Sequence, residues 1–540
     1  MEVVRKPRLR LGVFTDSAFQ PRWMVEALAD AAGADYAELA AIALPAGADK
    51  APAEAPLLWQ AYSKVDRAIF GGSADASERR DLTLLVPHER RVAMDLDERC
   101  WKARIGDARL DVAFVMGDID DARLEGLARH GVWRFCFGDA HGTREALAAV
   151  REVVTAHPVM ASGIHIHRGG GLPDRIACQS WSRTSAFSVS RSRDMLFSKT
   201  AQFLARAVRD LHAGGAKWIE QGTEPATARA SEGFPATSGL LRDITTLGAR
   251  VARRAAEKAL TVEEWSIAYR FSDDESWNGS LDGFHRLDPP KGGFWADPFP
   301  IQVRGRNYIF FEELLAGADK AHICVIEVDR EGRASAPVKV LERPYHLSYP
   351  FLIEEDGQLY MIPETATNNT VEIYRCVEFP TKWKLERVLM NGVFCADATL
   401  HRDGDKWWMF ANAATAGSDI NDELHLFSAD ELLGDWTPHR RNPVKSDVRG
   451  SRPAGRLFRS GNRLYRPGQI GAPLYGSGIA INRVTRLTQD EYLEEEDRRI
   501  VPPANSARGQ APSEAVLGIH TINRAGDLSV TDTFRRRARF

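Results

Sequence analysis

The chain has 540 residues, of which 44% are hydrophobic and 27% charged, a composition typical of folded globular proteins and unlike that of disordered chains. Its 71 Lys and Arg against 74 Asp and Glu give a net charge of -3, so no overall basic field favours nucleic acid as a partner. The length fits two large domains as well as three small ones.

Targeting and metal signals are absent from the sequence pattern. No apolar stretch reaches the length of a transmembrane helix, and the first ten residues lead into a strand instead of a signal-peptide core, so we expect a cytoplasmic protein. The six cysteines are scattered without a close pair, which predicts neither a disulfide framework nor a zinc knuckle. We expect no metal and no cofactor.

The first 212 residues alternate strand-like and helix-like segments. Short apolar runs predict buried strands, and the intervening segment 22–32 has helical spacing. The predicted strands cover 9–15, 36–44, 110–116 and 132–137. This order predicts an α/β domain with a largely parallel, Rossmann-type sheet.

Residues 213–260 are predicted to form a linker followed by an amphipathic helix. The linker, 213–236, is rich in Gly, Ala, Thr, Ser and Pro. The helix, 240–260, combines basic residues with an apolar stripe formed by Leu240, Ile244, Leu247 and Val251. We favour a docking helix with its charges in water, because amphipathic surface helices are the norm. Peripheral contact of 240–260 with an anionic membrane is the alternative.

Residues 261–540 contain a repeated hairpin, which is a strand, a turn glycine and a second strand. The turn glycines recur at steps of 47 to 65 residues, at Gly305, Gly357, Gly404, Gly461 and Gly526. This period fits four strands per unit and predicts an all-β five-bladed propeller. The segment 264–271 is expected to be the outer strand that closes the last blade.

The hairpin repeat also predicts a polar rim, because the first strand of a hairpin starts where the second one ends. The first strands open with Asp297, Tyr349, Asp397, Arg452 and His520, and the second strands end with Glu312, Glu364, Asn412 and Gln469. Trp295 and His346 complete the candidate substrate-binding set, and Trp295 and Tyr349 are expected to offer flat faces to sugar rings. Carboxylates beside aromatic rings are typical of glycosidic chemistry. Simple turn capping by Asp and Asn is the alternative, which recurrence in register disfavours.

These motifs carry a resemblance. Residues 265–540 resemble the propeller at the N-terminus of the plant glucosamine inositolphosphorylceramide transferases and of bacterial homologues, through FWADPF, HLSYPF with YMIPE, DATLHRDGDKWWMFA, RPAGRLF with RLYRPGQ, and LTQDEY. The propeller is more distantly similar to five-bladed arabinanase and β-xylosidase glycosidases. That resemblance implies Asp297 as general base and Asp397 as the carboxylate that modulates the pKa of its partner.

The fourth blade departs from the glycosidase pattern. The position of the acid Glu is occupied here by Ser451, Arg452 and Pro453, and an Arg cannot donate a proton at neutral pH. Glu364 from the second blade is a substitute acid. Alternatively, Arg452 marks an anionic substrate, which its planar guanidinium suits.

Residues 9–210 resemble the formyltransferase-like domain that accompanies this propeller in bacteria, through LRLGVFTDS, LDVAFVMGD, GVWRFCFGD and SVSRSRDMLFSKTAQFL. Active formyltransferases carry an Asn and a His two residues apart, where this chain has Arg134 and Cys136, and the Asp of that site has only Asp174, out of register, as a counterpart. The resemblance therefore implies a degenerate site. His165 and His167 alternate along one strand and are interpreted as partly buried histidines without a metal.

Together these features predict a carbohydrate-active protein that acts on a glycan, a glycolipid or a sugar nucleotide through the propeller. Hydrolysis and transfer both fit, and surface polysaccharide assembly is the expected setting. A non-catalytic glycan-binding or scaffold module is the first alternative, and a sugar-nucleotide formyltransferase, which would bind tetrahydrofolate, is the second. The sequence does not indicate an oligomeric state.

Overall fold

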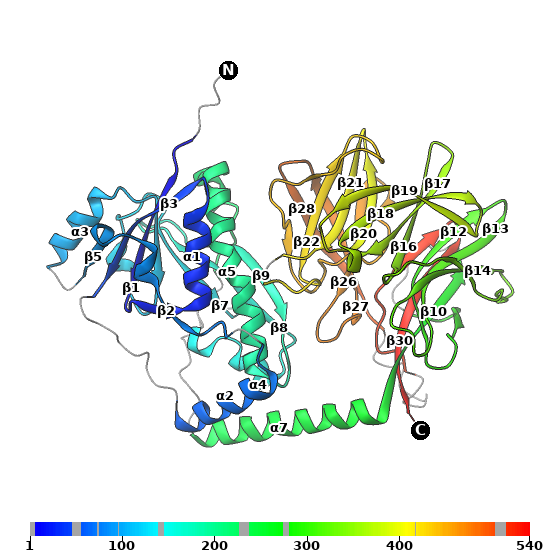
Figure 1. Ribbon diagram of the computed structural model, residues 1–540, viewed down its shortest axis with the longest axis horizontal. Coiled ribbons are helices and arrows are strands. Elements are labelled where there is room, and N and C mark those ends of the chain that lie inside the picture. Colours follow the sequence, from blue (N-terminus) through cyan, green and yellow to red (C-terminus); the bar gives the residue numbers. More distant parts are fainter. Residues whose placement is uncertain are drawn as a thin grey trace. The chain divides into compact units, whose positions relative to one another are not determined.

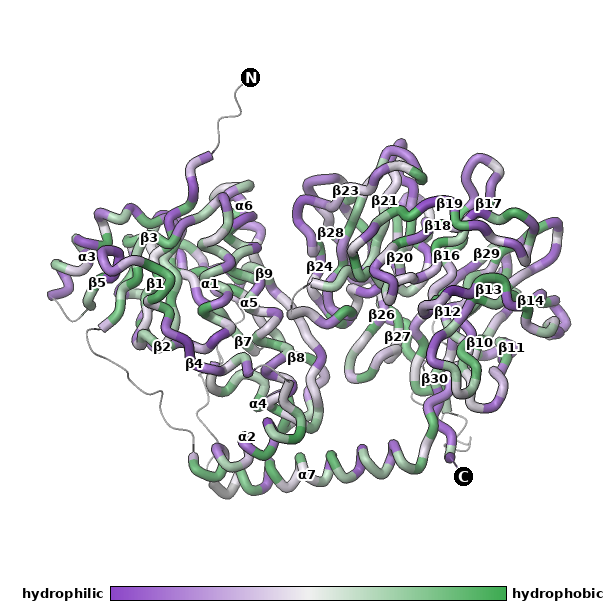
Figure 2. The backbone as a smooth tube through the Cα atoms, viewed as in Figure 1, coloured by the Kyte–Doolittle hydropathy of each residue, from purple (hydrophilic) through white to green (hydrophobic). Residues whose placement is uncertain are grey.

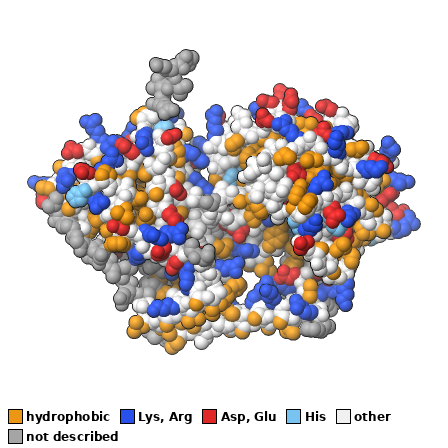
Figure 3. Space-filling model, viewed as in Figure 1, with side chains coloured by type: hydrophobic (Ala, Val, Ile, Leu, Met, Phe, Trp, Pro, Cys, Tyr) orange, Lys and Arg blue, Asp and Glu red, His pale blue; other side chains and the backbone are white. Residues whose placement is uncertain are grey.

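The computed structural model divides into two compact units, one formed mainly by residues up to Ala252 and the other mainly by residues from Arg253 on (Figure 1). Each unit is described separately. The structure describes residues 6–45, 56–72, 75–94, 97–138, 145–225, 237–273, 280–415, 417–502 and 515–539. On the face of the molecule in Figure 3, acidic and basic side chains are interspersed, in line with the near-neutral net charge.

The first unit is built on a seven-stranded mixed sheet in the order β5-β3-β1-β6-β7-β8-β9. The first five strands of this order are parallel, whereas β8 and β9 add an antiparallel edge. The bounds are β1 (Leu9–Thr15), β3 (Ala37–Leu44), β5 (Arg91–Ala93), β6 (Val112–Met116), β7 (Val132–Phe137), β8 (Val159–His167) and β9 (Arg175–Arg183), with a separate pair β2 (Phe19–Pro21) and β4 (Arg79–Asp81). The predicted α/β architecture is confirmed, and the formyltransferase likeness stays a prediction.

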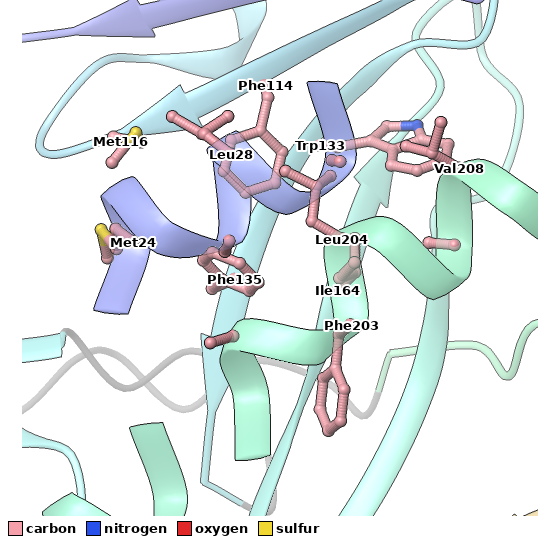
Figure 4. Packing of buried hydrophobic residues seen from close by; sticks show 14 of the residues in the cluster. Met24, Leu28, Phe114, Met116, Trp133, Phe135, Ile164, Phe203, Leu204 and Val208 are labelled. Carbon is pink, nitrogen blue, oxygen red and sulfur yellow. The ribbon is translucent and has the colours of Figure 1, made fainter. Parts of the chain in front are cut away.

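The helices of the first unit are α1 (Arg22–Gly33), α2 (Leu57–Phe70), α3 (Glu98–Asp107), α4 (Val150–Thr155), α5 (Val189–Gly214), α6 (Ala216–Ile219) and α7 (Thr237–Leu260). The helices α1 and α5 pack against the sheet around a core of large apolar side chains (Figure 4). Trp23 of α1 stacks on Phe197 of α5 with 5.0 Å between ring centroids. A second cluster, with Trp101 and Ile105 of α3, packs on other residues of the same sheet.

The apolar stripe of α7 is covered by protein contacts. Leu240 and Leu247 are buried in a cluster with Trp59 and Val153, and the helix alternates hydrophilic and hydrophobic residues along its length (Figure 2). Arg250 donates hydrogen bonds to the carbonyl oxygens of Val153 and Val154, at the end of α4, at 2.6 and 2.8 Å. Leu240, Ile244 and Leu247 of the stripe therefore pack within the first unit, and membrane contact through 240–260 stays an untested alternative.

Two further expectations concern the same region. The predicted boundary at residue 212 falls inside the last turn of α5, and α6 follows at once, while much of the predicted linker, 226–236, lies outside the described residues. Among the residues that the structure describes, no helix is both long enough and apolar enough to span a membrane.

The second unit contains five sheets of four main strands, which confirms the five-bladed propeller. Innermost strands of neighbouring blades contact one another, with β12 touching both β16 and β29 and β16 touching β20. The first blade contains β12 (Phe294–Val303), β13 (Arg306–Leu314), β14 (His322–Val328) and β15 (Val338–Leu341), and the second contains β16 (Ser348–Glu355), β17 (Gln358–Thr365), β18 (Thr370–Glu378) and β19 (Lys382–Asn391). The third blade contains β20 (Cys395–Asp403), β21 (Lys406–Ala413), β22 (Glu423–Ala429), β23 (Thr437–Pro438) and the added β24 (Lys445–Ser446), and the fourth contains β25 (Phe458–Ser460), β26 (Arg463–Ile470), β27 (Gly478–Leu487) and β28 (Tyr492–Ile500). The fifth blade contains β10 (Thr261–Phe271), β11 (His285–Leu287), β29 (Ile522–Ala525) and β30 (Leu528–Ala538).

The fifth blade joins both ends of the unit. Strand β10 pairs with β30 in an unbroken register from Thr261 opposite Ala538 to Phe271 opposite Leu528, so the expected closing strand over 264–271 is confirmed. All five predicted turn glycines have a positive φ, which explains why glycine recurs at these tight turns.

Candidate functional site

The same β-bulge recurs in the innermost strands of the first three blades. In each, two residues lie opposite one residue of the partner strand, between Ala296 and Phe299, between Ser348 and Phe351, and between Ala396 and Thr399. The first bulged residue has a positive φ, 51° at Asp297, 45° at Tyr349 and 53° at Asp397. A bulge of this kind bends the strand and re-aims one side chain. It also accommodates a proline without loss of a ladder hydrogen bond, as at positions 298 and 350.

The bulges bring the predicted rim residues together. Glu312 pairs with Ala296, Glu364 with Ser348 and Asn412 with Ala396, so each residue at the end of a second strand lies beside a bulge. In the fourth blade the innermost strand is interrupted, and the amide of Gln469 donates to the carbonyl oxygen of Arg452 at 2.7 Å. The hairpin register read from the sequence therefore agrees with the observed pairing of Glu312, Glu364 and Asn412.

Asp397 and Arg452 form the centre of one half of the site. The guanidinium of Arg452 donates to both carboxylate oxygens of Asp397, from Nε at 2.6 Å and from Nη2 at 3.2 Å. Nη2 also reaches Glu364 at 3.5 Å, and Nη1 donates to Asn421 Oδ1 at 3.0 Å. Gln469 Nε2 donates to Asp397 Oδ2 at 2.8 Å. Asp397 is thus a buried carboxylate with three side-chain hydrogen bonds.

These contacts change the expected role of Arg452. A guanidinium has five N–H donors, and the contacts to Asp397, Glu364 and Asn421 use four of them. The cation is already paired with a carboxylate and has one donor left, so it does not form an open, bidentate cradle for an anion in this structure. Arg452 instead compensates the charge of Asp397 and also contacts Glu364.

Asp297 and His520 form the other half of the site. His520 lies between two carboxylates, with Nε2 3.1 Å from Asp297 Oδ1 and Nδ1 2.9 Å from Asp532 Oδ2. Thr521 Oγ1 donates to Asp297 Oδ1 at 2.6 Å. Burial alone would lower the pKa of His520, but the charges of Asp532 and Asp297 outweigh it and raise that pKa to about 10. His520 is therefore a buried cation in this arrangement.

Asp297, His520 and Asp532 also present a set of atoms that could surround a metal ion, since one ligand atom from each lies within 4.8 Å of the others. A metal here would compete with the proton of His520, because a protonated imidazole has no lone pair to offer. The contacts observed are those of an ion-paired histidine.

The two carboxyl groups assigned to acid and base work have opposite pKa shifts. Burial raises the pKa of Glu364 well above its ordinary value, and the charge of Asp397 adds to this in spite of Arg452. Burial acts in the same direction on Asp297, but the charge and hydrogen bond of His520 overcome it and lower the pKa of Asp297. These surroundings therefore favour the protonated form of Glu364 and the ionised form of Asp297.

Glu312 and His346 pair at the edge of this cluster, with His346 Nε2 3.0 Å from Glu312 Oε1. Burial raises the pKa of Glu312, although its hydrogen bond to His346 works against the shift. The same hydrogen bond raises the pKa of His346, whose side chain is 32% exposed. His346 is therefore the most accessible of the predicted polar residues for which a contact is described.

The expected stacking faces of Trp295 and Tyr349 are wrong. Tyr349 is fully buried. Its hydroxyl forms one hydrogen bond with Thr399 Oγ1 at 2.8 Å and accepts another from the amide of Gly455 at 2.8 Å. Trp295 is 7% exposed and donates from Nε1 to Glu313 at 2.8 Å. Both rings are bound into the interior.

A half-buried ring, Tyr475, lies next to the cluster instead. Its ring centroid is 5.4 Å from the guanidinium carbon of Arg452 and 5.1 Å from the ring centroid of His520. The ring of Trp265, which is also half-buried, has its centroid 4.4 Å from that of His520. Tyr475 and Asn421 were missed because they lie outside the hairpin motif. Trp265, Thr521 and Asp532 lie in the fifth blade, where the repeat around Gly526 is the faintest and did not single them out.

Two predicted residues keep buried acceptor atoms without a partner among the described residues. Asn412 uses its Nδ2 to donate to the carbonyl oxygen of Ile420 at 2.7 Å, while Oδ1 has no hydrogen bond. Gln469 Oε1 is also buried and has no hydrogen bond among the described residues. Buried acceptors are normally satisfied, so these oxygens could accept from hydroxyl groups of a bound ligand.

The polar residues of the first unit are engaged with one another. Arg134 donates to Asp121, and Cys136 is buried. His165 and His167 both contact Asp174, at 3.0 and 3.1 Å. The two histidines thus share a carboxylate, and formyl transfer stays an untested second alternative.

Sequence comparison matches the family model "Glucosamine inositolphosphorylceramide transferase 1, N-terminal" to residues 289–511. The curated rice (Oryza sativa subsp. japonica) protein of that name is 34% identical over 215 residues, covering 38% of this chain and 29% of the rice protein. The Arabidopsis thaliana protein is 32% identical over 207 residues, covering 38% and 27%. The match therefore spans less than a third of these relatives. It confirms the resemblance of the propeller to the plant domain.

Structural comparison finds glycoside hydrolases at low similarity. Zg3597, a family 117 glycoside hydrolase from Zobellia galactanivorans, is 13% identical with a TM-score of 0.33, covering 50% of this chain and 90% of that one. The catalytic domain of Coprinopsis cinerea GH62 α-L-arabinofuranosidase is 12% identical with a TM-score of 0.34, covering 50% and 97%. The chain is thus similar in sequence, over residues 289–511, to the N-terminal part of glucosamine inositolphosphorylceramide transferases.

Proposed function

We propose that the propeller carries a centre for glycosidic chemistry, which acts on a glycan or glycolipid by hydrolysis or by transfer. The observation that carries this proposal is the opposite pKa shift of Glu364 and Asp297 within one buried cluster. Environments that shift the pKa values of two carboxyl groups in opposite directions suit one group to act as the acid and the other as the base.

In this proposal Glu364 protonates the leaving oxygen, and Asp297 activates water or an acceptor hydroxyl. Asp397 and Arg452 hold Glu364 in place, since Arg452 bonds both carboxylates. Deprotonation of Glu364 would place a second negative charge beside Asp397. This repulsion keeps Glu364 protonated before the proton is transferred to the leaving oxygen. His520 keeps Asp297 ionised.

The substrate class rests on the sequence match to proteins named as acting on an inositolphosphorylceramide. A sugar-bearing lipid or its glycan part is therefore the first substrate to test, with a cytoplasmic role in surface polysaccharide assembly as the setting. Because the match covers less than a third of those relatives, their transfer reaction is a proposal for this chain.

The test measures sugar release and sugar transfer by the wild type, Asp297→Asn and Glu364→Gln on a panel of pentosides, hexosides and glycolipids. Each substitution is expected to lower kcat by at least about 100-fold, the usual contribution of a positioned acid or base, with a small change in KM. Glu354→Gln, which makes the same change at an exposed position of β16, is the matched control. Full activity of both site variants on a confirmed substrate would contradict the assignment.

A binding module is the second candidate, and the extent of internal bonding favours it. Asp297 is 4% exposed and Asp397 1%, and each is held by several protein hydrogen bonds. Calorimetric binding of a panel member by the wild type, with no release or transfer, would establish recognition without catalysis.

A further inference from the structure

A second cluster of chemically reactive side chains lies within the first blade, and its three members were not among the residues predicted for the candidate site. Glu313 is on β13, and His322 and Cys324 are on β14. Glu313 pairs directly with His322, while Cys324, two residues further on, pairs with Phe311. Alternate residues of a strand point to one face, so the three side chains share one face of the sheet. They are 6%, 7% and 1% exposed.

The three side chains converge on one point. His322 Nε2 lies 3.0 Å and Cys324 Sγ 3.2 Å from the same oxygen of Glu313, Oε2. One ligand atom from each residue lies within 4.8 Å of the others. Bonds of about 2.0–2.3 Å to a tetrahedral ion leave its ligand atoms roughly 3–4 Å apart. The spacing of the cluster is therefore that of ligands around a single ion.

We propose that Glu313, His322 and Cys324 bind a zinc ion. Imidazole, thiolate and carboxylate are the three ligand types that Zn²⁺ takes in proteins, and a single thiolate with an imidazole disfavours the hard ions Ca²⁺ and Mg²⁺. The charges of one carboxylate and one thiolate cancel those of the ion, so a neutral assembly would occupy this buried place. Three protein ligands leave the fourth position of the ion to water.

The surroundings of the cluster suit a metal ligand set. Trp295 Nε1 donates to the other oxygen of Glu313, Oε1, at 2.8 Å. Hydrogen bonds of this kind fix the orientation of a ligating carboxylate. The zinc ion would tie β13 to β14 next to Glu312, whose side chain pairs with His346. The proposal is independent of the proposed glycosidic chemistry, because the three residues take no part in it.

Hydrogen bonding alone is the competing explanation, since the carboxylate of Glu313 accepts from Trp295 and faces both the thiol and the imidazole. Cys324→Ser separates the two. A serine hydroxyl keeps a donor to Glu313 but removes the thiolate. A pure hydrogen-bond cluster would therefore tolerate the substitution, whereas a zinc site would lose a ligand.

The experiment uses the full chain. Zinc content is measured by mass spectrometry after expression with zinc, and chelator-treated protein is titrated with Co²⁺. We expect about one zinc per wild-type chain and a cobalt–thiolate charge-transfer absorption, with the absorption lost in Cys324→Ser. Cys376→Ser, a half-buried free cysteine in the second blade, should behave as the wild type. The group of Asp297, His520 and Asp532 contains no sulfur and cannot give this absorption.

Two results would overturn the proposal. One is wild-type protein that takes up no stoichiometric zinc and shows no thiolate absorption with cobalt. The other is an unchanged absorption in Cys324→Ser, which would assign the thiolate to another cysteine. If Cys324→Ser fails to fold by circular dichroism, His322→Gln replaces it, and a loss of at least about tenfold in cobalt affinity is then the expected result.

Discussion

The buried cation His520 gives the stability of the propeller a characteristic dependence on pH. Its pKa is about 10 in the folded protein against an ordinary value of 6.5. Because the folded value is the higher one, the stabilisation is complete below about pH 6.5 and is lost as the pH rises towards 10. Between these values the folded protein holds a proton that the unfolded chain lacks.

The size of the effect follows from linkage. One proton held only by the folded state lowers the free energy of unfolding by about 1.4 kcal/mol for each unit of rising pH. From about pH 7.5 to about pH 9.5, His520 therefore accounts for a loss of about 2.5 kcal/mol. His520→Gln removes the titrating group, so the variant should lack this part of the slope.

The assay is urea unfolding of the wild type and His520→Gln, followed by tryptophan fluorescence at several pH values in this window. Other groups titrate in both proteins, so the difference between the two slopes isolates His520. Asp532→Asn is a second variant, which can keep the hydrogen bonds that Asp532 Oδ1 accepts from the amides of His520 and Thr521, at 2.8 and 3.1 Å, but removes the charge. Its slope should fall between those of the other two proteins.

Parallel slopes of wild type and His520→Gln across this window would refute the reasoning. They would mean that His520 is neutral in the folded protein. A direct reading of the imidazole by nuclear magnetic resonance then gives the protonation state without reference to unfolding.

Three further outcomes follow from packing and charge. Leu247→Ala in α7 should lower the free energy of unfolding of the first unit by about 2–5 kcal/mol in thermal unfolding, because Leu247 is 2% exposed. Leu241→Ala, at a residue 52% exposed, should have little effect. Equal effects of the two substitutions would contradict the packing of α7. Tyr349→Phe should destabilise the propeller by about 1–3 kcal/mol, since the amide of Gly455 loses its acceptor; an unchanged urea midpoint would argue against that hydrogen bond. Activity on a confirmed substrate should fall at high pH as Glu364 loses its proton, and Glu364→Gln should lose that limb of the pH profile.

Much of the propeller could be predicted because its information is local. Turn glycines and alternating apolar residues define each hairpin, and the hairpin register then places Glu312, Glu364 and Asn412 next to the bulges. Closure of the fifth blade by 264–271 followed from the same pattern. The hairpins depend on hydrogen bonds between strands that are adjacent in the sequence, whereas the closing strand pairs with a strand at the far end of the unit.

The bulges were beyond the sequence pattern, and they changed what the rim residues do. A positive φ at Tyr349 turns its ring into the interior, where Thr399 and Gly455 bond its hydroxyl. A strand drawn from period-two alternation alone would leave that ring at the rim. The expectation of a stacking face at Tyr349 failed for this reason.

By itself the sequence determined the two-part organisation, the five repeats and the set of polar residues near one rim. Only the tertiary structure decided which charged groups lie in contact. Arg452, which precedes the fourth-blade strand β25, contacts Asp397 of the third blade and Glu364 of the second. His520 lies between Asp297 of the first blade and Asp532 of the fifth. Pairings between blades depend on how the ring closes and on where each bulge aims its side chain. Neither leaves a periodic trace in the chain, whereas the strands themselves do.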